Sequence, residues 1–304
     1  GEIQDTGYRN QDSGFRIYLP ESWDLIPESS SFLCGLCVLC GSIFSIPGGL
    51  AKNMGKPFIR EKTVKSVLSK SGIPGVDYCL NPYVGCAHGC RYCYATFMKR
   101  FTGHTEPWGT FVDVKVNTPE VLQRQMKRAG RGYVMLSSVT DPYQPLEKRY
   151  GLTRRCLEIL LKHQFPVGIL TKSPLVLRDL DLIEQFEDIK VGMTIATDDD
   201  GIKKIFEPET PPIEMRIQAL KELHDRGIGT YAFIGPLLPQ NPEVLAEKIK
   251  PYVDSILVDR MNYLNKTVGL YRRYHLTEWL EEDLIDDVLH RLKKAFSGKE
   301  VNIC

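Results

Sequence analysis

The sequence predicts an α/β fold, namely a partial (β/α)6 TIM-like barrel built on an open parallel sheet. Two observations lead to this prediction. Short β-rich runs alternate with amphipathic segments over most of the chain, which is typical of βα units. The chain has 304 residues, 42% of them hydrophobic and 25% charged, and that length is enough for one such barrel around a large core.

Six runs account for the strands of this barrel. Each is short, rich in β-branched or aromatic residues, and separated from the next by a helical pattern. In barrels and open sheets of this kind, ligands bind at the carboxyl ends of the strands, so we expect the functional residues there. The expected strands are residues 83–84, 133–136, 167–170, 191–195, 231–234 and 255–258.

Helix-start and helix-stop signals lie between these runs. We expect Thr153 to cap a helix that stops before Pro166, and Ser173 with Pro174 to open the next one. Three further segments are expected to be helical: residues 212–225, ending at Gly227; the segment opened by Asn241; and a terminal amphipathic helix at 277–296, acidic first and basic last.

The first fifty-odd residues differ from the rest. Residues 29–50 carry no charge and resemble the apolar region of a signal peptide, but acidic rather than basic residues precede them. We therefore expect residues 1–53 to be an appendage, disordered or the product of a misplaced start, and residues 54–304 to form the catalytic domain with its C-terminal helix. No apolar run is long enough to span a bilayer, so no membrane association is expected.

The nine cysteines are unevenly distributed, since six of them form two tight triplets. This clustering in a large chain indicates metal or cluster ligation in a reducing compartment, and we place the protein in the cytoplasm. The first triplet, Cys34, Cys37 and Cys40, lacks the fourth cysteine of a ferredoxin-type motif. We favour apolar cysteines here; an auxiliary cluster completed by Cys304 or Cys79 is the alternative.

The second triplet carries the chemistry. In NPYVGCAHGCRYCYATF, Cys86, Cys90 and Cys93 follow a C-x3-C-x2-C spacing. Three thiolates hold three irons of a [4Fe-4S] cluster and leave the fourth iron open, whereas electron carriers normally supply four cysteines. An open iron can chelate the amino and carboxylate groups of S-adenosylmethionine (SAM). One electron then cleaves a carbon–sulfur bond and releases a 5′-deoxyadenosyl radical.

Two other interpretations of this triplet remain open. A zinc site would need a fourth ligand, which His88 or a distant histidine would have to supply. The thiols could also be inert, although inert thiols would not require Gly85 and Gly89 or an aromatic residue before the last cysteine. Neither alternative explains the spacing as well as a cluster does.

With these residues in view, the segment from about residue 62 to 263 resembles the radical SAM superfamily, in its spore photoproduct lyase-like branch. SKSGIPGVDYCLNPYVGC and FMKRFTGHTEPWGTFVDVKVN are similar to radical SAM mobile pair proteins. The resemblance implies a barrel of the radical SAM type and a set of SAM contacts. These are Tyr92 near the adenine, the pair Thr140 and Asp141, Lys172 at the SAM carboxylate, and Thr194 in the same pocket.

Several further positions are candidates for the site. Arg216 matches a signature that the resemblance implies, but it lies in a helical pattern and is expected to be structural or substrate-facing. Residues of the loop TGHTEPWG are expected either to line the mouth of the site or to brace it: His104, Glu106 and Trp108. The best substrate-side candidates follow the Thr–Asp pair: Tyr143, Gln144 and Glu147.

One position departs from the lyases. They have a hydrogen-donating cysteine shortly before the Ser-Asp or Thr-Asp pair, and here Ser138 occupies that position. Its O–H bond is too strong to donate a hydrogen atom easily, and neither Cys79 nor Cys156 replaces it by sequence alone. Repair of spore photoproduct is therefore the less favoured activity.

The leading functional hypothesis is a radical SAM enzyme that acts on an unidentified substrate, either a peptide or protein or a nucleic acid. The net charge of +1 favours no nucleic-acid partner, but runs such as MKRAGRG and YRRYH mix cations with aromatic residues. The enzyme would require a flavodoxin- or ferredoxin-type electron donor. Lesion reversal and a non-catalytic iron–sulfur protein are the alternatives.

Overall fold

The computed structural model describes residues 57–304, so the predictions for residues 1–53 and for Cys34, Cys37 and Cys40 lie outside the described residues. The main sheet has eight strands in the order β11-β10-β9-β8-β7-β6-β3-β2. All neighbouring strands are parallel except β2 and β3. The strands are β2 Leu68–Lys70, β3 Tyr78–Leu80, β6 Val134–Leu136, β7 Val167–Thr171, β8 Ile189–Thr194, β9 Gly229–Ile234, β10 Ser255–Val258 and β11 Glu300–Ile303.

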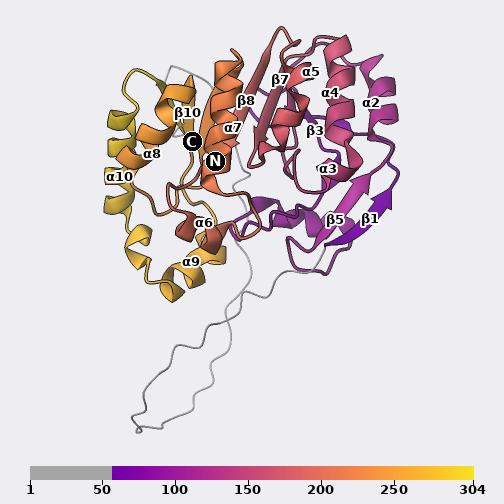
Figure 1. The fold of residues 1–304 in the computed structure, drawn as a ribbon. Coiled ribbons are helices and arrows are strands. Elements are labelled where there is room, and N and C mark those ends of the chain that lie inside the picture. Colours follow the sequence, from indigo (N-terminus) through magenta and orange to yellow (C-terminus); the bar gives the residue numbers. More distant parts are fainter. Residues whose placement is uncertain (1–56) are drawn as a thin grey trace, which may run out of the picture.

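Helices connect successive strands and cover one face of this sheet (Figure 1). The principal ones are α2 Thr118–Met126, α4 Leu152–Lys162, α5 Leu180–Ile183, α6 Asp200–Phe206, α7 Ile213–Asp225, α8 Pro242–Ile249, α9 Leu264–Arg273 and α10 Glu282–Ala295. Short helices complete the described chain: η1 Tyr94–Met98, α1 Lys99–Thr102, α3 Glu147–Tyr150, η2 Pro174–Asp179, η3 Lys250–Tyr252 and η4 Thr277–Leu280. The central strands therefore follow one another in chain order, as in a partial TIM-like barrel.

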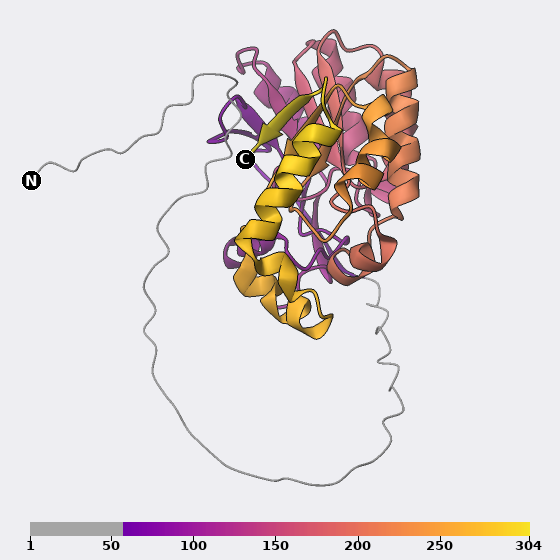
Figure 2. The same cartoon turned by 90° about the vertical axis from the view of Figure 1, so that its left-hand side faces the viewer.

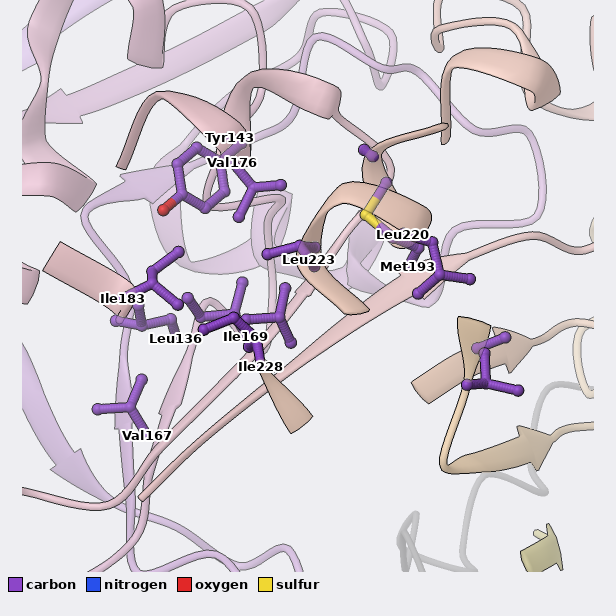
Figure 3. Close-up of a cluster of buried hydrophobic side chains, with 14 of the residues drawn as sticks. Leu136, Tyr143, Val167, Ile169, Val176, Ile183, Met193, Leu220, Leu223 and Ile228 are labelled. Carbon is purple, nitrogen blue, oxygen red and sulfur yellow. The ribbon is translucent and has the colours of Figure 1, made fainter. Parts of the chain in front are cut away.

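The main core lies between the sheet and these helices. Figure 3 shows part of it, with Leu136, Ile169 and Met193 from the strands beside Leu220 and Leu223 of α7. These side chains are almost fully buried. The hydrophobic effect of burying one such side chain contributes about 1.5–3 kcal/mol, so this layer supplies much of the driving force for folding.

The opposite, inner face of the sheet is less covered. Along β9, Thr230, Ala232 and Ile234 are buried, whereas Tyr231 and Phe233 are partly exposed. This alternation follows from the pleat of a strand, which sends successive side chains to opposite faces. Gly192 on β8 pairs with Tyr231 and leaves room for its ring, because a Cβ at Gly192 would lie 2.2 Å from the Tyr231 Cζ atom.

A smaller three-stranded sheet, in the order β1-β5-β4, lies beside α3 in Figure 1. Its strands are β1 Phe58–Lys62, β4 Tyr83–Val84 and β5 Phe111–Lys115. Asp113 on β5 is completely buried and accepts hydrogen bonds from Arg60 and Lys62. The loop that follows β4 carries the second cysteine triplet, so this sheet supports one side of the candidate site.

Three predictions about the elements are wrong. Residues 83–84 form β4 of the small sheet, and β3 takes their expected place as the first barrel strand. Thr153 does not cap α4; Gly151 is the N-cap residue, and the Thr153 hydroxyl donates to the Pro142 carbonyl oxygen. The terminal helix is interrupted at Glu281, which separates η4 from α10. Figure 2 shows α10 beside β11, a parallel edge strand that the sequence did not reveal.

The other element predictions are confirmed within two residues at each end. The Ser173 hydroxyl accepts from the Leu175 amide at the start of η2, and Asn241 caps α8 in the same way. Gly227 follows α7 with a positive φ of 75°, a backbone conformation that favours glycine. Within residues 57–304, no helix is both long enough and apolar enough to cross a membrane.

Candidate active site

The three cysteines lie in the loop between β4 and η1. Cys86 and Cys90 are buried and Cys93 is partly exposed. Gly85 precedes the first cysteine with φ of +84°, and a Cβ there would lie 2.4 Å from the Phe111 carbonyl oxygen. The loop can therefore pack tightly onto β5 only with glycine at this position.

Two tight turns bring the three cysteines together in one short loop: the Gly89 amide donates to the Cys86 carbonyl oxygen, and the Cys93 amide donates to the Cys90 carbonyl oxygen. Burial raises the pKa of Cys90, Lys172 lowers it, and Glu207 and the neighbouring Cys93 and Cys86 raise it further. Burial also raises the pKa of Cys86 to about 12, while the His88 and Asp141 amides lower it by pointing at the sulfur. Such amide donors stabilise thiolates, the form that binds iron.

His88, which a zinc site could use as a fourth ligand, lies beside the first cysteine of the trio. Among the residues that the structure describes, no group of three or more His, Cys, Asp or Glu side chains is arranged to hold one metal ion. His88 is 2% exposed with no hydrogen bond to either ring nitrogen, and its Nε2 lies 3.4 Å from Asp141 Oδ2.

Gln144 holds the cysteine loop in place from the neighbouring strand end. Its Oε1 accepts from the Ala87 amide at 3.0 Å, and its Nε2 donates to the Gly85 carbonyl oxygen at 3.3 Å. The Thr140 hydroxyl donates to the same carbonyl oxygen at 2.7 Å. Both backbone groups flanking Cys86 are therefore fixed by side chains that follow β6. Gln144 is fully buried, and it supports the loop rather than facing a substrate.

Asp141 connects the end of β6 to the end of β7. Its Oδ1 accepts from the Thr171 hydroxyl at 2.6 Å, and its Oδ2 accepts from the Lys172 amide at 2.8 Å. Burial alone would raise the pKa of Asp141, but His88 and these hydrogen bonds outweigh burial and lower it to about 2. The carboxylate therefore stays ionised at neutral pH, and it orients the backbone from which the Lys172 side chain extends.

A buried charged network surrounds Tyr92. The Tyr92 hydroxyl donates to Glu207, which lies just after α6, and Arg216 of α7 forms an ion pair with Glu207 at 2.6 Å. Lys172 Nζ lies 3.9 Å from Glu207 Oε1 and 5.8 Å from the centre of the Tyr92 ring. Burial opposes charge on Glu207, but Arg216 and Lys172 hold its pKa below the ordinary value.

Lys172 lies close enough to Cys90 to interact with it electrostatically. Burial would lower its pKa, but Cys90 and Glu207 outweigh burial and raise it. Thr194 ends β8 and is 2% exposed, and its carbonyl oxygen accepts from Arg216. Tyr92, Lys172 and Thr194 are thus all linked to the pair formed by Glu207 and Arg216, and Arg216 is structural.

The expectation that Tyr143 and Glu147 face the substrate is wrong. Both are completely buried. Glu147 accepts from the Tyr83 hydroxyl and the Thr153 amide, and it forms an ion pair with Arg178 at 2.8 Å. It joins α3, β4 and η2, which is a structural role.

The loop that follows α1 braces the site. His104 is buried, with Nε2 2.9 Å from Asp113 Oδ1 and Nδ1 2.9 Å from Glu106 Oε2. The Trp108 indole Nε1 makes no conventional hydrogen bond, yet its proximity lowers the pKa of the Cys93 thiol against the larger, opposite effect of burial. Of the three predicted residues, Trp108 alone adjoins a cysteine of the trio.

Ser138 lies at the rim of the inner face. Its carbonyl oxygen accepts from the Tyr94 hydroxyl, and its own hydroxyl accepts from Asn81. The Tyr94 phenol is also close to Cys93 and to Cys79 of β3, since both raise its pKa after the larger contribution of burial. Cys79 on β3 pairs with Met135 of β6, whereas Cys156 belongs to the main core.

Glu207 and the supporting role of Gln144 were missed from the sequence. A glutamate before a proline, nine residues ahead of the arginine that it binds, gives no periodic signal. Its only sequence clue is the resemblance that included Arg216.

The comparisons with known proteins agree with this geometry. A sequence profile of the radical SAM superfamily matches residues 80–250. An uncharacterised protein of Methanocaldococcus jannaschii is 40% identical over 244 residues, covering 76% of this chain and 91% of that protein. A radical SAM Nα-GlyT isomerase of Pseudomonas phage M6 is 26% identical over 163 residues, covering 52% of this chain and 32% of that protein.

Among solved structures, a spore photoproduct lyase complexed with dinucleoside spore photoproduct superposes with a TM-score of 0.60. The match covers 81% of this chain and 82% of the lyase at 14% identity, so the likeness is one of fold. The superfamily profile, by contrast, spans more than half of the sequence and includes all three cysteines. The chain therefore belongs to the radical SAM superfamily of enzymes.

Proposed function

We propose that this enzyme holds a [4Fe-4S] cluster on Cys86, Cys90 and Cys93 and cleaves SAM reductively to generate a 5′-deoxyadenosyl radical. The observation that carries the proposal is that one short loop holds Cys86, Cys90 and Cys93, with backbone amide donors at two of the thiols and the partly buried Lys172 beside Cys90. When bound, the cluster supplies the electron and an open iron for the amino-acid end of SAM. Residues 54–304 would form the catalytic domain, working in a reducing compartment such as the cytoplasm.

The residues around the trio match the chemical groups of SAM. Lys172 would bind the SAM carboxylate, since it is a positioned ammonium group next to Cys90. Tyr92 would pack near the adenine, held by its bond to Glu207. Asp141 would keep the Lys172 backbone in position, and Thr140 and Thr194 would complete the pocket. Each of these side chains is already ordered by the protein, which lowers the entropic cost of binding.

The inner face of the sheet would receive the substrate. Its partly exposed side chains include Tyr231, Phe233 and Leu257, which are aromatic or apolar. A peptide, protein or nucleic acid fits such a surface. Repair of spore photoproduct stays disfavoured because Ser138 stands where the lyases have their hydrogen donor.

Anaerobic reconstitution with iron and sulfide tests the proposal directly. The wild-type chain should bind about four irons, and dithionite with SAM should yield 5′-deoxyadenosine and methionine. The C86A/C90A/C93A variant should lose both, whereas C304A, which removes a thiol outside the trio, should retain them. K172A should keep its iron and bind SAM roughly tenfold more weakly, as expected for losing one charge-assisted contact.

The alternatives give different results in the same assays. A non-catalytic iron–sulfur protein would bind iron but form no 5′-deoxyadenosine. A zinc protein would bind one equivalent of zinc and no sulfide. Conversion of a spore-photoproduct dinucleotide to thymidine units by the wild-type enzyme would restore the repair hypothesis.

A further inference from the structure

An exposed aromatic series begins at the residue after Cys93. Tyr94 and Phe97 are stacked with ring centres 6.3 Å apart, and Phe97 meets Phe101 edge to face at 6.2 Å. The exposed fractions rise along the series from 38% for Tyr94 to 40% for Phe97 and 75% for Phe101. Exposed aromatic rings in a row are uncommon on a protein surface and are enriched where partners bind.

Basic residues predominate around this series, and the nearest acidic residue along the chain is Glu106, which is paired with His104. Residues 91–105 contain Arg91, Lys99 and Arg100 and no aspartate or glutamate. From the neighbouring α9, Lys266 Nζ reaches 3.1 Å from the Cys93 carbonyl oxygen and 2.8 Å from the Thr96 hydroxyl. The acidic residues that follow begin at Glu278, after α9 has ended. We name Phe97, Lys99, Phe101 and Lys266 the aromatic-basic face.

The aromatic-basic face adjoins a cysteine of the trio. Lys266 and the η1 helix both contact the Cys93 segment, and Cys93 is the most exposed of the three thiols. The inner strands, where a substrate must reach SAM, contact this segment through the Tyr94 hydroxyl and Ser138. A partner that docks on Phe97 and Phe101 is therefore close to the cluster ligands without entering the sheet.

We propose that the aromatic-basic face is the docking surface for the electron donor, a small acidic protein that carries a low-potential flavin or iron–sulfur centre. The inference rests on the proposed function, since a cluster that cleaves SAM has to be reduced. Electron transfer slows steeply with distance, so the donor must dock beside the cluster. Positive charge attracts an acidic carrier over a distance, and redox encounters of this kind use small interfaces.

The test compares two reductants in the same enzyme. Dithionite is small and needs no docking surface. A bacterial flavodoxin, kept reduced by its reductase and NADPH, needs a docking surface. F97A/F101A and K99E should each lower the rate of 5′-deoxyadenosine formation with limiting flavodoxin by roughly tenfold, the loss expected for one important interface contact. With dithionite, both variants should match the wild type within about twofold.

A matched control is K127E. Lys127 is an exposed cation that follows α2, and that end of α2 leads into β6, so it lies toward the amino ends of the strands, whereas the candidate site lies at their carboxyl ends. This variant changes the net charge as K99E does and should keep the flavodoxin-driven rate. Rising ionic strength should slow the flavodoxin-driven reaction of the wild type and leave the dithionite-driven one unchanged.

Three outcomes overturn the inference. Equal losses with both reductants would show that the face supports the site itself. Unchanged flavodoxin rates, together with weaker binding of a fluorescent single-stranded oligonucleotide by F97A/F101A, would identify a nucleic-acid surface. Unchanged flavodoxin rates alone would place docking elsewhere. If the wild type forms no 5′-deoxyadenosine even with dithionite, the proposed function fails first, and the docking inference falls with it.

Discussion

Arg216 and Glu207 form an ion pair at 2.6 Å in which both side chains are only 1% exposed. Burying two charges is costly, so the pair adds little stability by itself, but removing one partner leaves the other charge unpaired inside the protein. Because Tyr92 and Lys172 both contact Glu207, the pair sets the positions of two residues proposed to bind SAM.

Substitution of Glu207 should therefore affect stability and SAM binding together. E207Q keeps the shape of the side chain but leaves Arg216 unpaired, and we expect it to lower the free energy of unfolding by roughly 3 kcal/mol. SAM affinity should fall roughly tenfold because the uncharged amide no longer holds Tyr92 and Lys172 in position. Urea denaturation and equilibrium binding measure the two effects.

The double variant E207Q/R216M is the control for this prediction. Both buried charges are then absent, so it should be more stable than E207Q, while SAM binding stays weak. A double variant less stable than E207Q would contradict the view that an unpaired charge causes the loss.

Gln144 should determine how long the cluster survives. Q144A leaves the Ala87 amide without its partner and removes one of two donors to the Gly85 carbonyl oxygen, so the Cys86 backbone becomes less constrained. We expect roughly fivefold faster loss of cluster absorbance in the presence of an iron chelator, which corresponds to about 1 kcal/mol.

Gln125 offers a matched control. It also bonds backbone groups through both ends of its amide, accepting from the Val67 and Leu68 amides and donating to the Leu68 carbonyl oxygen, and none of these groups belongs to the loop of Cys86, Cys90 and Cys93. Q125A should lose stability without any change in the rate of cluster loss. Equal rates in the two variants would assign the effect of Q144A to general destabilisation.

Asp113 should make the protein sensitive to acid. Burial raises the pKa of this carboxyl, but hydrogen bonds from Arg60, Lys62 and His104 outweigh burial and hold it well below its ordinary value. The stabilisation is therefore complete above about pH 4, the unfolded value, and is lost as the pH falls through the lower folded value. The urea midpoint of the wild type should decrease over that acidic range.

D113N removes this titration. The variant should be less stable at neutral pH by roughly 2–3 kcal/mol, because three donors lose a charged acceptor, and its urea midpoint should depend less on acidic pH. A variant with the same acid dependence as the wild type would show that other carboxyl groups dominate.

Gly192 should tolerate no side chain. G192A would push the Tyr231 ring off the inner face, since its Cβ would lie 2.2 Å from a ring atom, and overpacking of this kind costs about 1–3 kcal/mol. Y231A removes the obstacle, so G192A/Y231A should lose less stability than the sum of the two single variants. Additive losses in thermal unfolding would exclude the clash.

The sequence predicted the parts of the fold that local patterns encode. Strands such as β7 and β10 combine β-branched runs with clear helix signals after them, and the spacing of the cysteines is itself local. Tyr83 and Val84 have the same local preference for a strand as Cys79 and its neighbours. The segment around Cys79 joins the main sheet because it pairs with β6, whereas Tyr83 and Val84 pair with β5 in the small sheet. Glu300–Ile303 is too polar to stand out, and it becomes a strand because β10 offers an unpaired edge.

The candidate site also contains some residues that local patterns predict and others whose roles depend on long-range contacts. Tyr92, Asp141 and Lys172 follow recognisable motifs at strand ends, so their neighbourhood could be predicted. Glu147 looks like a substrate ligand in sequence, because nothing local reveals that Arg178, 31 residues away, neutralises it in the interior. Long-range ion pairs decide which polar residues are available, and a single sequence does not display them.

Within residues 57–304, β2 and β11 stand at the two ends of the main sheet and do not pair with each other, so this sheet is open. A closed barrel would admit only molecules that fit through one of its ends. An open sheet also leaves an opening between its two edge strands. A projecting group of a long polymer can pass through such an opening while the rest of the polymer stays outside. If the enzyme acts as proposed, such an open sheet would limit the size of the reacting group and not that of the whole substrate.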